Sequence, residues 1–338
     1  MRLTLDTDAL IANWRALDRL SGNASAGAAV KADAYGLGAR RVAALLQQAG
    51  CADFLVAHWS EAADLAGVVA PGRIAVLHGP ISPADAAFAR DTGLIPVINS
   101  LHQARQWQEA RGGHCHLMVD TGINRLGLPL SALGDPIVAG LQIDLLLSHL
   151  ACADEDSALN PLQRDRWIEA RSHIAHRRAS LANSAGIALG PSYHGVLTRP
   201  GIALYGGVPC AALGPHIRQV ARPEAQVIQV RELQPGDSIG YNATFTAAAP
   251  MRVGVVGIGY ADGYLRCWSG KGAMLADGAR LPVLGRVSMD MTVIDLAGAP
   301  AVGEGDWVAL DYALPEAARL SGLSQYELLT ALGRRFPR

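Results

Sequence analysis

One lysine stands at the point where a buried strand gives way to a turn. The segment Ala28-Ala29-Val30-Lys31-Ala32-Asp33-Ala34-Tyr35-Gly36 is an apolar run that ends in Lys31 and continues into small residues and a glycine. Although the chain has 29 lysines and arginines, only Lys31 and Lys271 are lysines. Arginine cannot lose its proton in a protein, whereas a buried lysine can, and it can then form a Schiff base or act as a base. The position and rarity of Lys31 therefore favour a chemical role over that of a lysine that extends its charge to solvent.

Further polar residues stand at the ends of other expected strands. They are Arg125, His149, Asn183, Ser184, Arg199 and the glycine Gly201. The carboxyl ends of the strands of a parallel barrel meet at one rim, so these groups are expected to converge on Lys31. Ser184 and the backbone at Gly201 follow the seventh expected strand and precede the eighth, where such barrels often hold a phosphate. A lysine beside a phosphate site indicates pyridoxal phosphate as the cofactor.

The elements that must position these residues alternate regularly. After a first helix over 7–20 and a first strand ending at Lys31, strands are expected at 54–56, 74–77, 95–98, 116–119, 145–147, 180–182 and 202–204. Helical patterns fall between them at 38–49, 60–67, 82–91, 100–111 and 161–178. Such alternation predicts a parallel sheet, and eight units predict a closed (β/α)8 TIM-type barrel, which we expect over 8–222.

The pattern changes near residue 222. Turn signals at 235–237, 277–278 and 303–306 separate β-rich runs such as 253–256 and 291–294, which predicts a mainly-β domain over 223–338. The N-terminal strand 1–7 is expected to join this domain. A last helix is expected from Ser324 to Gly333, because Ser324 and Glu327 form a capping-box pattern.

The totals exclude several classes of protein. A chain of 338 residues has the length of two domains, and its net charge of -1 argues against nucleic acid and anionic membranes as partners. The N-terminus has no apolar signal core, and no apolar run reaches membrane-spanning length. Five scattered cysteines are typical of reduced thiols, so a cytoplasmic location is expected. His114 and His116 share a strand face, but no third ligand is evident, and we expect no metal.

The segment around Lys31 resembles the pyridoxal-phosphate signature of the alanine racemases. Other segments resemble further motifs of that family, in the family's order across nearly the whole chain: Asp120–Gly127 (DTGINRLG), Ala182–Ala185 (ANSA), Arg199–Gly206 (RPGIALYG), Gly240–Thr244 (GYNAT), Gly257–Gly263 (GIGYADG), Gly285–Met291 (GRVSMDM) and Gln325–Glu327 (QYE). The resemblance implies the barrel and β-domain architecture, pyridoxal phosphate, and interconversion of L-alanine and D-alanine, either to supply D-alanine or to break it down.

The resemblance also implies the roles of individual residues. Lys31 would carry the cofactor and serve as one catalytic base, and Tyr241 would be the second base on the opposite face of the substrate. Arg199 would donate to the pyridine nitrogen of the cofactor. An unperturbed tyrosine ionises only near pH ~10, so a hydrogen-bonded chain through His149 and Arg199 would help Tyr241 to act as a base.

The remaining implied contacts surround the phosphate and the substrate. Arg125 would face the phenolic oxygen of the cofactor and the substrate carboxylate, the Met289 backbone N–H would reach that carboxylate, and Tyr260 would line the entrance. Tyr241, Tyr260 and Met289 would come from a neighbouring subunit, which makes a homodimer necessary for activity. The phosphate and the rest of the cofactor would be bound by Tyr35, Asn183, Ser184, Gly201, Ile202 and Tyr326.

One departure and three alternatives stay open. Many members of the family carry a carbamylated lysine two residues before the Asp-Thr-Gly motif, and this chain has Met118 there. A racemase of another or broader amino-acid range, such as serine, is the nearest alternative. An amino-acid decarboxylase of similar architecture is disfavoured because Arg199 stands where an acidic residue would be expected. A non-catalytic pyridoxal-phosphate-binding barrel is disfavoured by the β-domain with Tyr241.

Overall fold

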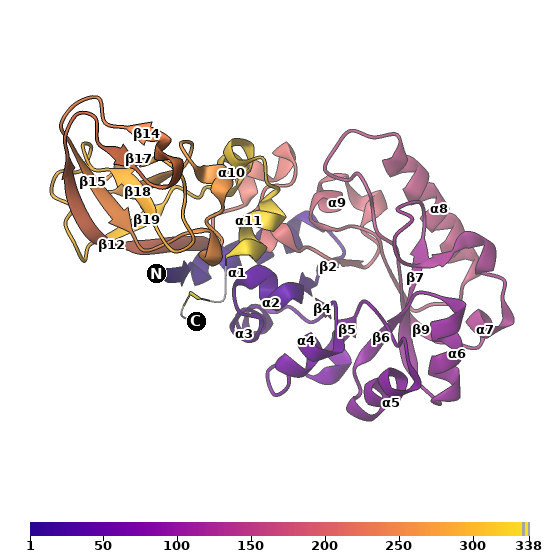
Figure 1. Cartoon of the computed structure of the whole chain (residues 1–338). Helices are drawn as coiled ribbons and strands as arrows, with labels where there is room; N and C mark the ends of the chain where they lie inside the picture. The colour runs from indigo at the N-terminus through magenta and orange to yellow at the C-terminus, as the bar shows by residue number, and fades with distance from the viewer. Residues whose placement is uncertain (333–334, 337–338) are drawn as a thin grey trace. The chain divides into compact units, whose positions relative to one another are not determined.

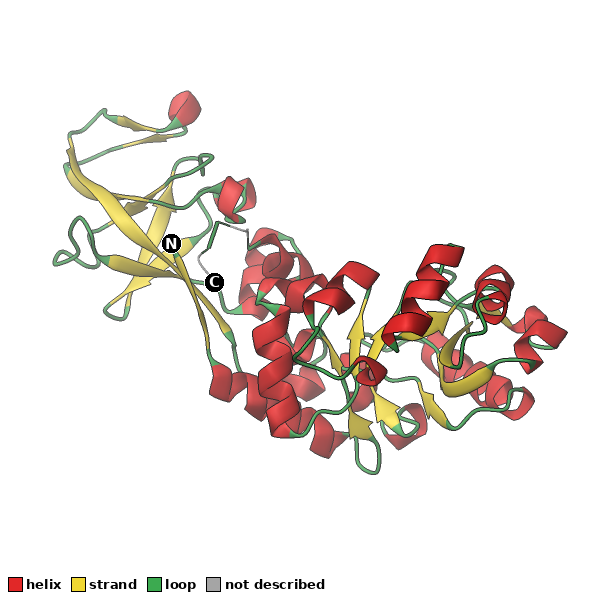
Figure 2. Ribbon diagram, turned by 90° about the horizontal axis from the view of Figure 1, so that it is seen from below, coloured by secondary structure: helices red, strands yellow, loops and turns green. Residues whose placement is uncertain are grey.

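The computed structural model describes residues 1–332 and 335–336. Its contacts divide the chain into two compact units, one of residues 8–218 and one of residues 1–7 together with the chain from 219 onward. Figure 1 follows both units by colour along the chain, and Figure 2 separates helices from strands. Within the described residues, no helix combines the length and the apolarity that a membrane span needs.

Parallel strands form the centre of the unit 8–218. They run side by side in the order β3-β4-β5-β6-β7-β9-β10, and β11 pairs in parallel with β2. Backbone bonds of 2.9 Å from Gly27 N to Thr198 O and from Val196 N to Ala179 O close the ring. The strands are β2 (Ser25–Ala26), β3 (Ala28–Ala29), β4 (Phe54–Val56), β5 (Ile74–Val76), β6 (Ile95–Ile98), β7 (His114–Asp120), β9 (Gln142–Leu147), β10 (Arg178–Ser180) and β11 (Leu197–Thr198), with β8 (Leu128–Pro129) added beside β7.

Helices connect these strands and cover their outer side. Ser82 and Ser100 cap two of them by accepting the backbone N–H of the third helical residue, as their sequences predict. The helices are α1 (Thr7–Leu20), α2 (Lys31–Gly36), α3 (Ala39–Ala49), α4 (Trp59–Asp64), α5 (Pro83–Thr92), α6 (Leu101–Glu109), α7 (Pro136–Ala139), α8 (Leu159–His173) and α9 (Ser184–Ala188).

Strand side chains alternate between the inside of the barrel and the helices. On β9, Leu145 and Leu147 belong to an inner cluster, whereas Leu146 packs in an outer one. On β7, Met118 points inward, and its neighbours Leu117 and Val119 pack outward. This period of two is the geometry of any strand, and here it fills a barrel interior with apolar side chains.

Two strand predictions were wrong in position. The segment expected to be the eighth strand, 202–204, is a 3-10 helix, η4 (Ile202–Tyr205), and the strand lies earlier, at β11. Pro200 has no N–H to continue a ladder, so the chain turns before the apolar run instead of after it. The seventh strand ends at Ser180, not at residue 182, because the Ala182 N–H is bonded to Tyr193 O, in the segment that follows α9.

The other unit is an antiparallel sheet with two short helices. Its strands follow the order β1-β12-β15-β18-β17-β16-β19, and the last strand, β19, also pairs with β12, the neighbour of β1. They are β1 (Arg2–Leu5), β12 (Ala221–Leu233), β15 (Met251–Val256), β16 (Ala273–Ala276), β17 (Ala279–Leu284), β18 (Thr292–Asp295) and β19 (Trp307–Leu310), beside the hairpin of β13 (Ser238–Ile239) and β14 (Phe245–Thr246).

The helices of this unit are α10 (Leu314–Ser321) and α11 (Gln325–Ala331). Ser324 caps α11, and the predicted capping box with Glu327 is present. The predicted end of this helix, Gly333, lies outside the described residues. The fold class predicted from the sequence, a parallel barrel followed by a mainly-β domain, is confirmed.

Candidate active site

Lys31 begins a turn of unusual hand. The next four residues, 32–35, have φ values of 52, 53, 53 and 57°, so the chain makes one left-handed turn. L-residues in this region are disfavoured by ~1–2 kcal/mol each, and such strain is characteristic of functional sites. Glu61 holds the turn in place, because its carboxylate accepts from the backbone N–H groups of Ala32 (2.7 Å), Ala57 (2.6 Å) and His58 (3.2 Å).

The surroundings of Lys31 favour its uncharged form. The side chain is half-buried, and burial lowers its pKa below the ordinary value. The positive charge of Arg125 lowers the pKa further, while Glu61 opposes both effects without cancelling them. A neutral amine is the form that acts as a nucleophile or a base, so this environment suits the chemistry expected of Lys31.

Tyr35, Ser184 and Gly201 form a cradle beside that turn. Tyr35 is buried, and its ring lies 4.7 Å from the ring of Tyr205. A Cβ on Gly201 would lie 2.3 Å from the Tyr35 hydroxyl, so only glycine allows this hydroxyl to come so close to the backbone. The buried Ser184 Oγ accepts from the backbone N–H groups of Gly201 (2.9 Å) and Ala203 (3.3 Å). Two hydroxyls and two backbone N–H groups thus lie around Gly201, with the N–H groups bonded to Ser184 Oγ. Hydroxyl and N–H groups are the donors that an anion site uses.

Arg199 is buried without a carboxylate. Its guanidinium donates to Ser180 Oγ, to Ser148 O and, at 3.3 Å, to Leu181 O. Among the described residues no acidic side chain forms an ion pair with it, and burial lowers its pKa to about 10. The group remains charged at neutral pH, and among the described residues it has neutral acceptors but not the anion that usually accompanies a buried cation.

His149 lies among three positive groups. Burial, and after it the charges of Arg199, Arg125 and Lys31, together lower its pKa to about 3. The imidazole is therefore neutral at physiological pH. The backbone carbonyl of His149 accepts from Gln163 Nε2 at 3.0 Å, which fixes the end of β9. The hydrogen-bonded chain between His149 and Arg199 stays a prediction.

The loop of Arg125 is ordered by an aspartate. Asp120 Oδ1 accepts from the N–H groups of Gly122 (2.8 Å), Ile123 (3.0 Å) and Asn124 (3.2 Å). Arg125 itself is exposed, and Asn124 adopts a left-handed φ of 53°. Met118 is 6% exposed and packs inside the barrel, so the position of the family's modified lysine is apolar here.

The remaining predicted residues lie in the other unit and are far more exposed. Tyr241 in η6 (Tyr241–Ala243) is 66% exposed and Met289 is 53% exposed. Tyr260 is half-buried, and Arg266 lies over its ring at 5.1 Å. The backbone bond from Tyr260 N to Ser288 O (3.0 Å) places Tyr260 and Met289 on adjoining loops. Tyr326 lies on α11 and is 46% exposed.

Two residues of the barrel site escaped the sequence analysis. Glu61 fell inside a segment marked only by helical periodicity, although an acidic residue in the first turn of α4 is a capping signal. Tyr205 was part of a motif but received no role, and its hydroxyl donates to Ala29 O at 2.8 Å beside the Lys31 turn. Among the described residues, no group of three possible metal ligands comes together.

Comparison with known families gives a match over both units. The profile described as "Alanine racemase, N-terminal domain" matches residues 5–209, and the profile described as "Alanine racemase, C-terminal domain" matches residues 220–338. The chain is 41% identical to the biosynthetic alanine racemase of Agrobacterium fabrum over 100% of this chain and 93% of that protein. It is 40% identical to the catabolic alanine racemase of the same organism over 99% of this chain and 91% of that protein.

Solved structures give the same answer for the fold. The crystal structure of alanine racemase from Bartonella henselae with covalently bound pyridoxal phosphate has a TM-score of 0.91 to this chain at 35% identity, covering 100% of this chain and 98% of that one. The biosynthetic alanine racemase of Pseudomonas aeruginosa has a TM-score of 0.89 at 36% identity, covering 100% and 99%.

Proposed function

This chain belongs to the alanine racemase family, and on that premise we propose that it interconverts L-alanine and D-alanine with two bases, Lys31 and Tyr241, on opposite faces of the substrate. The observation that carries the proposal is the setting of Lys31 on a strained turn. Its amine has a lowered pKa and lies within electrostatic reach of Arg125 and of the half-buried His149. A lysine that served only as a surface charge would need none of these features.

The residues of the barrel fit pyridoxal phosphate, which the Bartonella henselae enzyme holds covalently. The Tyr35 hydroxyl, which lies against the backbone at Gly201, and the Ser184 hydroxyl with the N–H groups of Gly201 and Ala203 suit a phosphate. Tyr35, Ile202, Asn183 and, by resemblance, Tyr326 complete the set of residues that would hold the cofactor. When bound, pyridoxal phosphate withdraws electrons from the α-carbon of an amino acid and so acidifies its α-proton.

Arg199 sets how strong that electron withdrawal is. Its guanidinium, charged at neutral pH, can only donate, so it would face a pyridine nitrogen that carries no proton. An unprotonated nitrogen gives weaker withdrawal, which suits exchange of a proton and limits side reactions. The same residue argues against the decarboxylase alternative, in which a carboxylate would keep that nitrogen protonated.

The two bases divide the proton transfers between them. The neutral amine of Lys31 would take the α-proton of D-alanine, and Tyr241 would take that of L-alanine from the other face. Arg125 and the Met289 N–H would hold the substrate carboxylate, and Tyr260 would line the entrance. Such positioning keeps the α-proton in line with each base.

Tyr241, Tyr260 and Met289 would reach the site from a partner subunit in a homodimer. Support comes from the exposure of Tyr241 and Met289, since large exposed apolar side chains mark interaction sites. We also place the enzyme in the cytoplasm, because all five cysteines are free thiols. Both a biosynthetic and a catabolic relative lie near 40% identity, so a role in supplying or in breaking down D-alanine fits this chain equally.

The decisive experiment is a racemisation assay of the purified holoenzyme over a panel of amino acids. Alanine is expected to have the highest kcat/KM, and serine is the competitor to measure beside it. Borohydride reduction followed by peptide mapping should leave a pyridoxyl group on Lys31 and none on Lys271, the matched control. A colourless protein without label at Lys31, or a protein that racemises no amino acid, would refute the proposal.

A further inference from the structure

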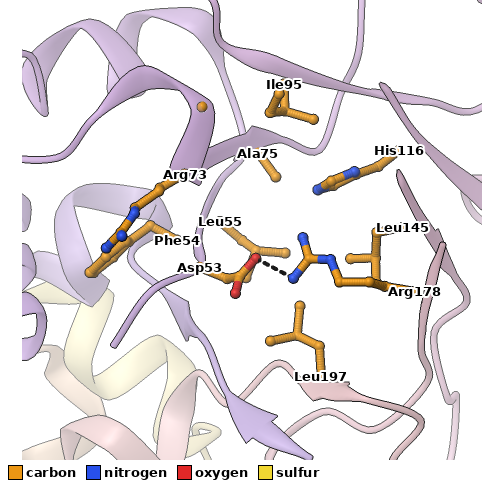
Figure 3. A pocket seen from close by; sticks show the side chains of 11 residues that line it. Asp53, Phe54, Leu55, Arg73, Ala75, Ile95, His116, Leu145, Arg178 and Leu197 are labelled. Atoms are coloured by element: carbon orange, nitrogen blue, oxygen red, sulfur yellow. Dashed lines mark hydrogen bonds and ion pairs between the residues drawn. The ribbon is translucent and has the colours of Figure 1, made fainter. Parts of the chain in front are cut away.

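A charged cluster lies at the end of the barrel opposite Lys31. Arg178, the first residue of β10, donates to Asp53 at 2.9 Å and to Asp144 of β9 at 2.8 and 3.1 Å. Figure 3 shows the Arg178 guanidinium between the Asp53 carboxylate and the His116 ring. Asp53 immediately precedes β4, and His116 lies in the first half of β7. These residues therefore belong to the beginnings of the strands, whereas the cofactor residues follow their ends.

Arg178 is the principal positive charge of this cluster. His116 is 5% exposed, and burial lowers its pKa to about 4 against the opposing pull of Asp144, so the imidazole is neutral. Arg177 is largely exposed and lies 3.9 Å from Asp144. Burial alone would raise the pKa of Asp144, but hydrogen bonding to Arg178 and its charge outweigh burial and lower that pKa. Without Arg178, two partly buried carboxylates would repel each other across the barrel.

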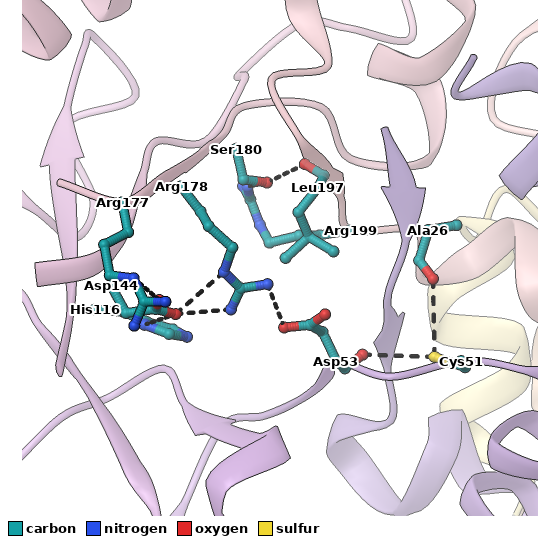
Figure 4. Close-up of polar contacts among 10 residues, drawn as sticks. All are labelled: Ala26, Cys51, Asp53, His116, Asp144, Arg177, Arg178, Ser180, Leu197 and Arg199. Carbon is teal, nitrogen blue, oxygen red and sulfur yellow. Dashed lines mark hydrogen bonds and ion pairs between the residues drawn. The ribbon is translucent and has the colours of Figure 1, made fainter. Parts of the chain in front are cut away.

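The strands that this cluster joins also carry every acceptor named above for Arg199. Ser180 is the last residue of β10, and Leu181 follows it directly. Ser148 follows the last residue of β9. Figure 4 shows Arg178 and Ser180 on one strand, with Arg199 beside Ser180 and the ion pairs of Arg178 at its other end. Successive residues of a strand are ~3.3 Å apart, so only about 7 Å of backbone separates the two anchors.

Backbone pairing and apolar packing also hold β10. The strand has three residues and pairs in parallel with β9 on one side. On its other side an isolated bridge of Ser180 with Gly195 and the bond from Val196 N to Ala179 O connect it to the next segment. The hydroxyl of Ser180 also donates to Leu197 O at 2.5 Å. Ala179, 2% exposed, packs in an apolar cluster with Trp167, and the side-chain bonds of Arg178 add the polar ties at the start of this strand.

We propose that Arg178 is a positioning residue for Arg199, since its bonds to Asp53 and Asp144 hold β9 and β10 where Ser148, Ser180 and Leu181 can orient the Arg199 guanidinium. The inference rests on the proposed function, in which Arg199 faces the pyridine nitrogen of the cofactor. It assigns a task to a cluster that touches neither cofactor nor substrate. A displacement of ~1 Å in a reacting group can reduce a rate by ~10²-fold, so a small shift of β10 is sufficient.

The test compares Arg178→Met with Arg177→Met in the holoenzyme. Arg177 is the neighbouring, exposed arginine, so its variant controls for the loss of one charge. For Arg178→Met we expect kcat to fall at least about tenfold with little change in KM, and the cofactor absorbance band to shift. In the apoenzyme, hydrogen exchange at the amides of 180–182 and 199 should become faster. Arg178→Lys keeps one ion pair, so its kcat and the position of its cofactor absorbance band should lie between those of Arg178→Met and the unmodified enzyme.

Two results would overturn the inference. One is an Arg178→Met enzyme whose kcat and absorbance band match those of Arg177→Met. The other applies if Arg178→Met does not fold. In that case Arg178→Lys and Asp53→Asn, each of which leaves one ion pair to β10, would overturn the inference if both kept the kcat and the cofactor absorbance band of the unmodified enzyme. Failure of the proposed function is distinct from both, because the unmodified enzyme would then show no racemisation to compare.

Discussion

The two units of this protein present their predicted catalytic residues in opposite ways. In the barrel, Arg199, Tyr35 and Ser184 are buried and held by hydrogen bonds or close packing. In the β-unit, Tyr241 and Met289 are more than half exposed. The barrel residues are thus preorganised by their own unit, whereas the exposed residues of the β-unit are not. The proposed site would combine both kinds of residue, with those of the β-unit supplied by the partner subunit.

Removing Lys31 should have the largest effect. Lys31→Ala is expected to lower kcat by about 10⁴-fold or more, because both the covalent attachment and one general base are lost. Steady-state racemisation with added cofactor measures it, and Lys271→Ala serves as the control. If Lys31→Ala kept more than about a tenth of the rate, the chemistry assigned to the barrel would be wrong.

Tyr241→Phe should come next, at about 10²- to 10⁴-fold in kcat. Because Tyr241 is exposed, the variant should have the same folding stability as the unmodified protein. Exchange of the α-deuteron with solvent separates the two bases, since the variant should still release it from D-alanine through Lys31 but no longer from L-alanine. Equal exchange from both enantiomers would remove Tyr241 from the mechanism.

Mixing the two inactive variants tests the comparison of the units directly. A heterodimer of Lys31→Ala and Tyr241→Phe subunits contains one intact site if Tyr241 crosses to the partner, so activity should return on subunit exchange or co-expression. If each chain instead supplied its own Tyr241, both sites of the heterodimer would be defective and the mixture would stay inactive.

Gly201→Ala should have a smaller effect, on the cradle formed by Tyr35, Ser184 and Gly201. Its Cβ would lie 2.3 Å from the Tyr35 hydroxyl, so we expect a loss of about 1–3 kcal/mol in stability and weaker cofactor binding. Thermal unfolding and titration of the apoenzyme with pyridoxal phosphate measure the two effects. Gly134→Ala, where a Cβ meets nothing within 4 Å, is the matched control. Cofactor affinity equal to that of the control would argue against the cradle.

The smallest effect concerns acid stability. His116 is neutral in the fold and has a pKa of about 4, below its value near 6.5 in the unfolded chain. Between these values the unfolded chain binds more protons, so stability is lost as the pH falls through this window, by about 1 kcal/mol per pH unit. Denaturant unfolding at pH 6 and pH 5 should show a smaller loss for His116→Gln. An equal loss in both proteins would exclude His116 as the source.

The sequence predicted the barrel well where strands are continuous apolar runs. The strands at 54–56 and 95–98 lie at the expected residues, because turn residues on both sides leave such runs no other arrangement in a buried parallel sheet. The apolar run 202–204 was wrongly predicted to be a strand, since burial alone does not distinguish a strand from a 3-10 turn. The family resemblance is confirmed, whereas the roles of single site residues stay predictions.

Three features of the site had no sequence signal that we could use. The left-handed turn 32–35 contains no glycine, so its hand arises from tertiary contacts such as those of Glu61. The partners of Arg199 are mainly backbone carbonyls, which every residue possesses. The cluster of Arg178 draws on strands far apart in the chain, so pairing its residues required the register of the barrel.

The hand of the turn after Lys31 has a consequence for the chirality of the chain itself. With φ 52° and ψ 46°, Ala32 adopts the mirror image of ordinary α-helical geometry, and Ala34 at 53° and 49° does the same. That geometry is the comfortable one for a residue of the D configuration. A semisynthetic chain carrying D-alanine at 32 and 34 would relieve strain that L-alanine must bear. The best-fitting residue for the turn that carries the catalytic lysine is therefore the enantiomer that the enzyme is proposed to make.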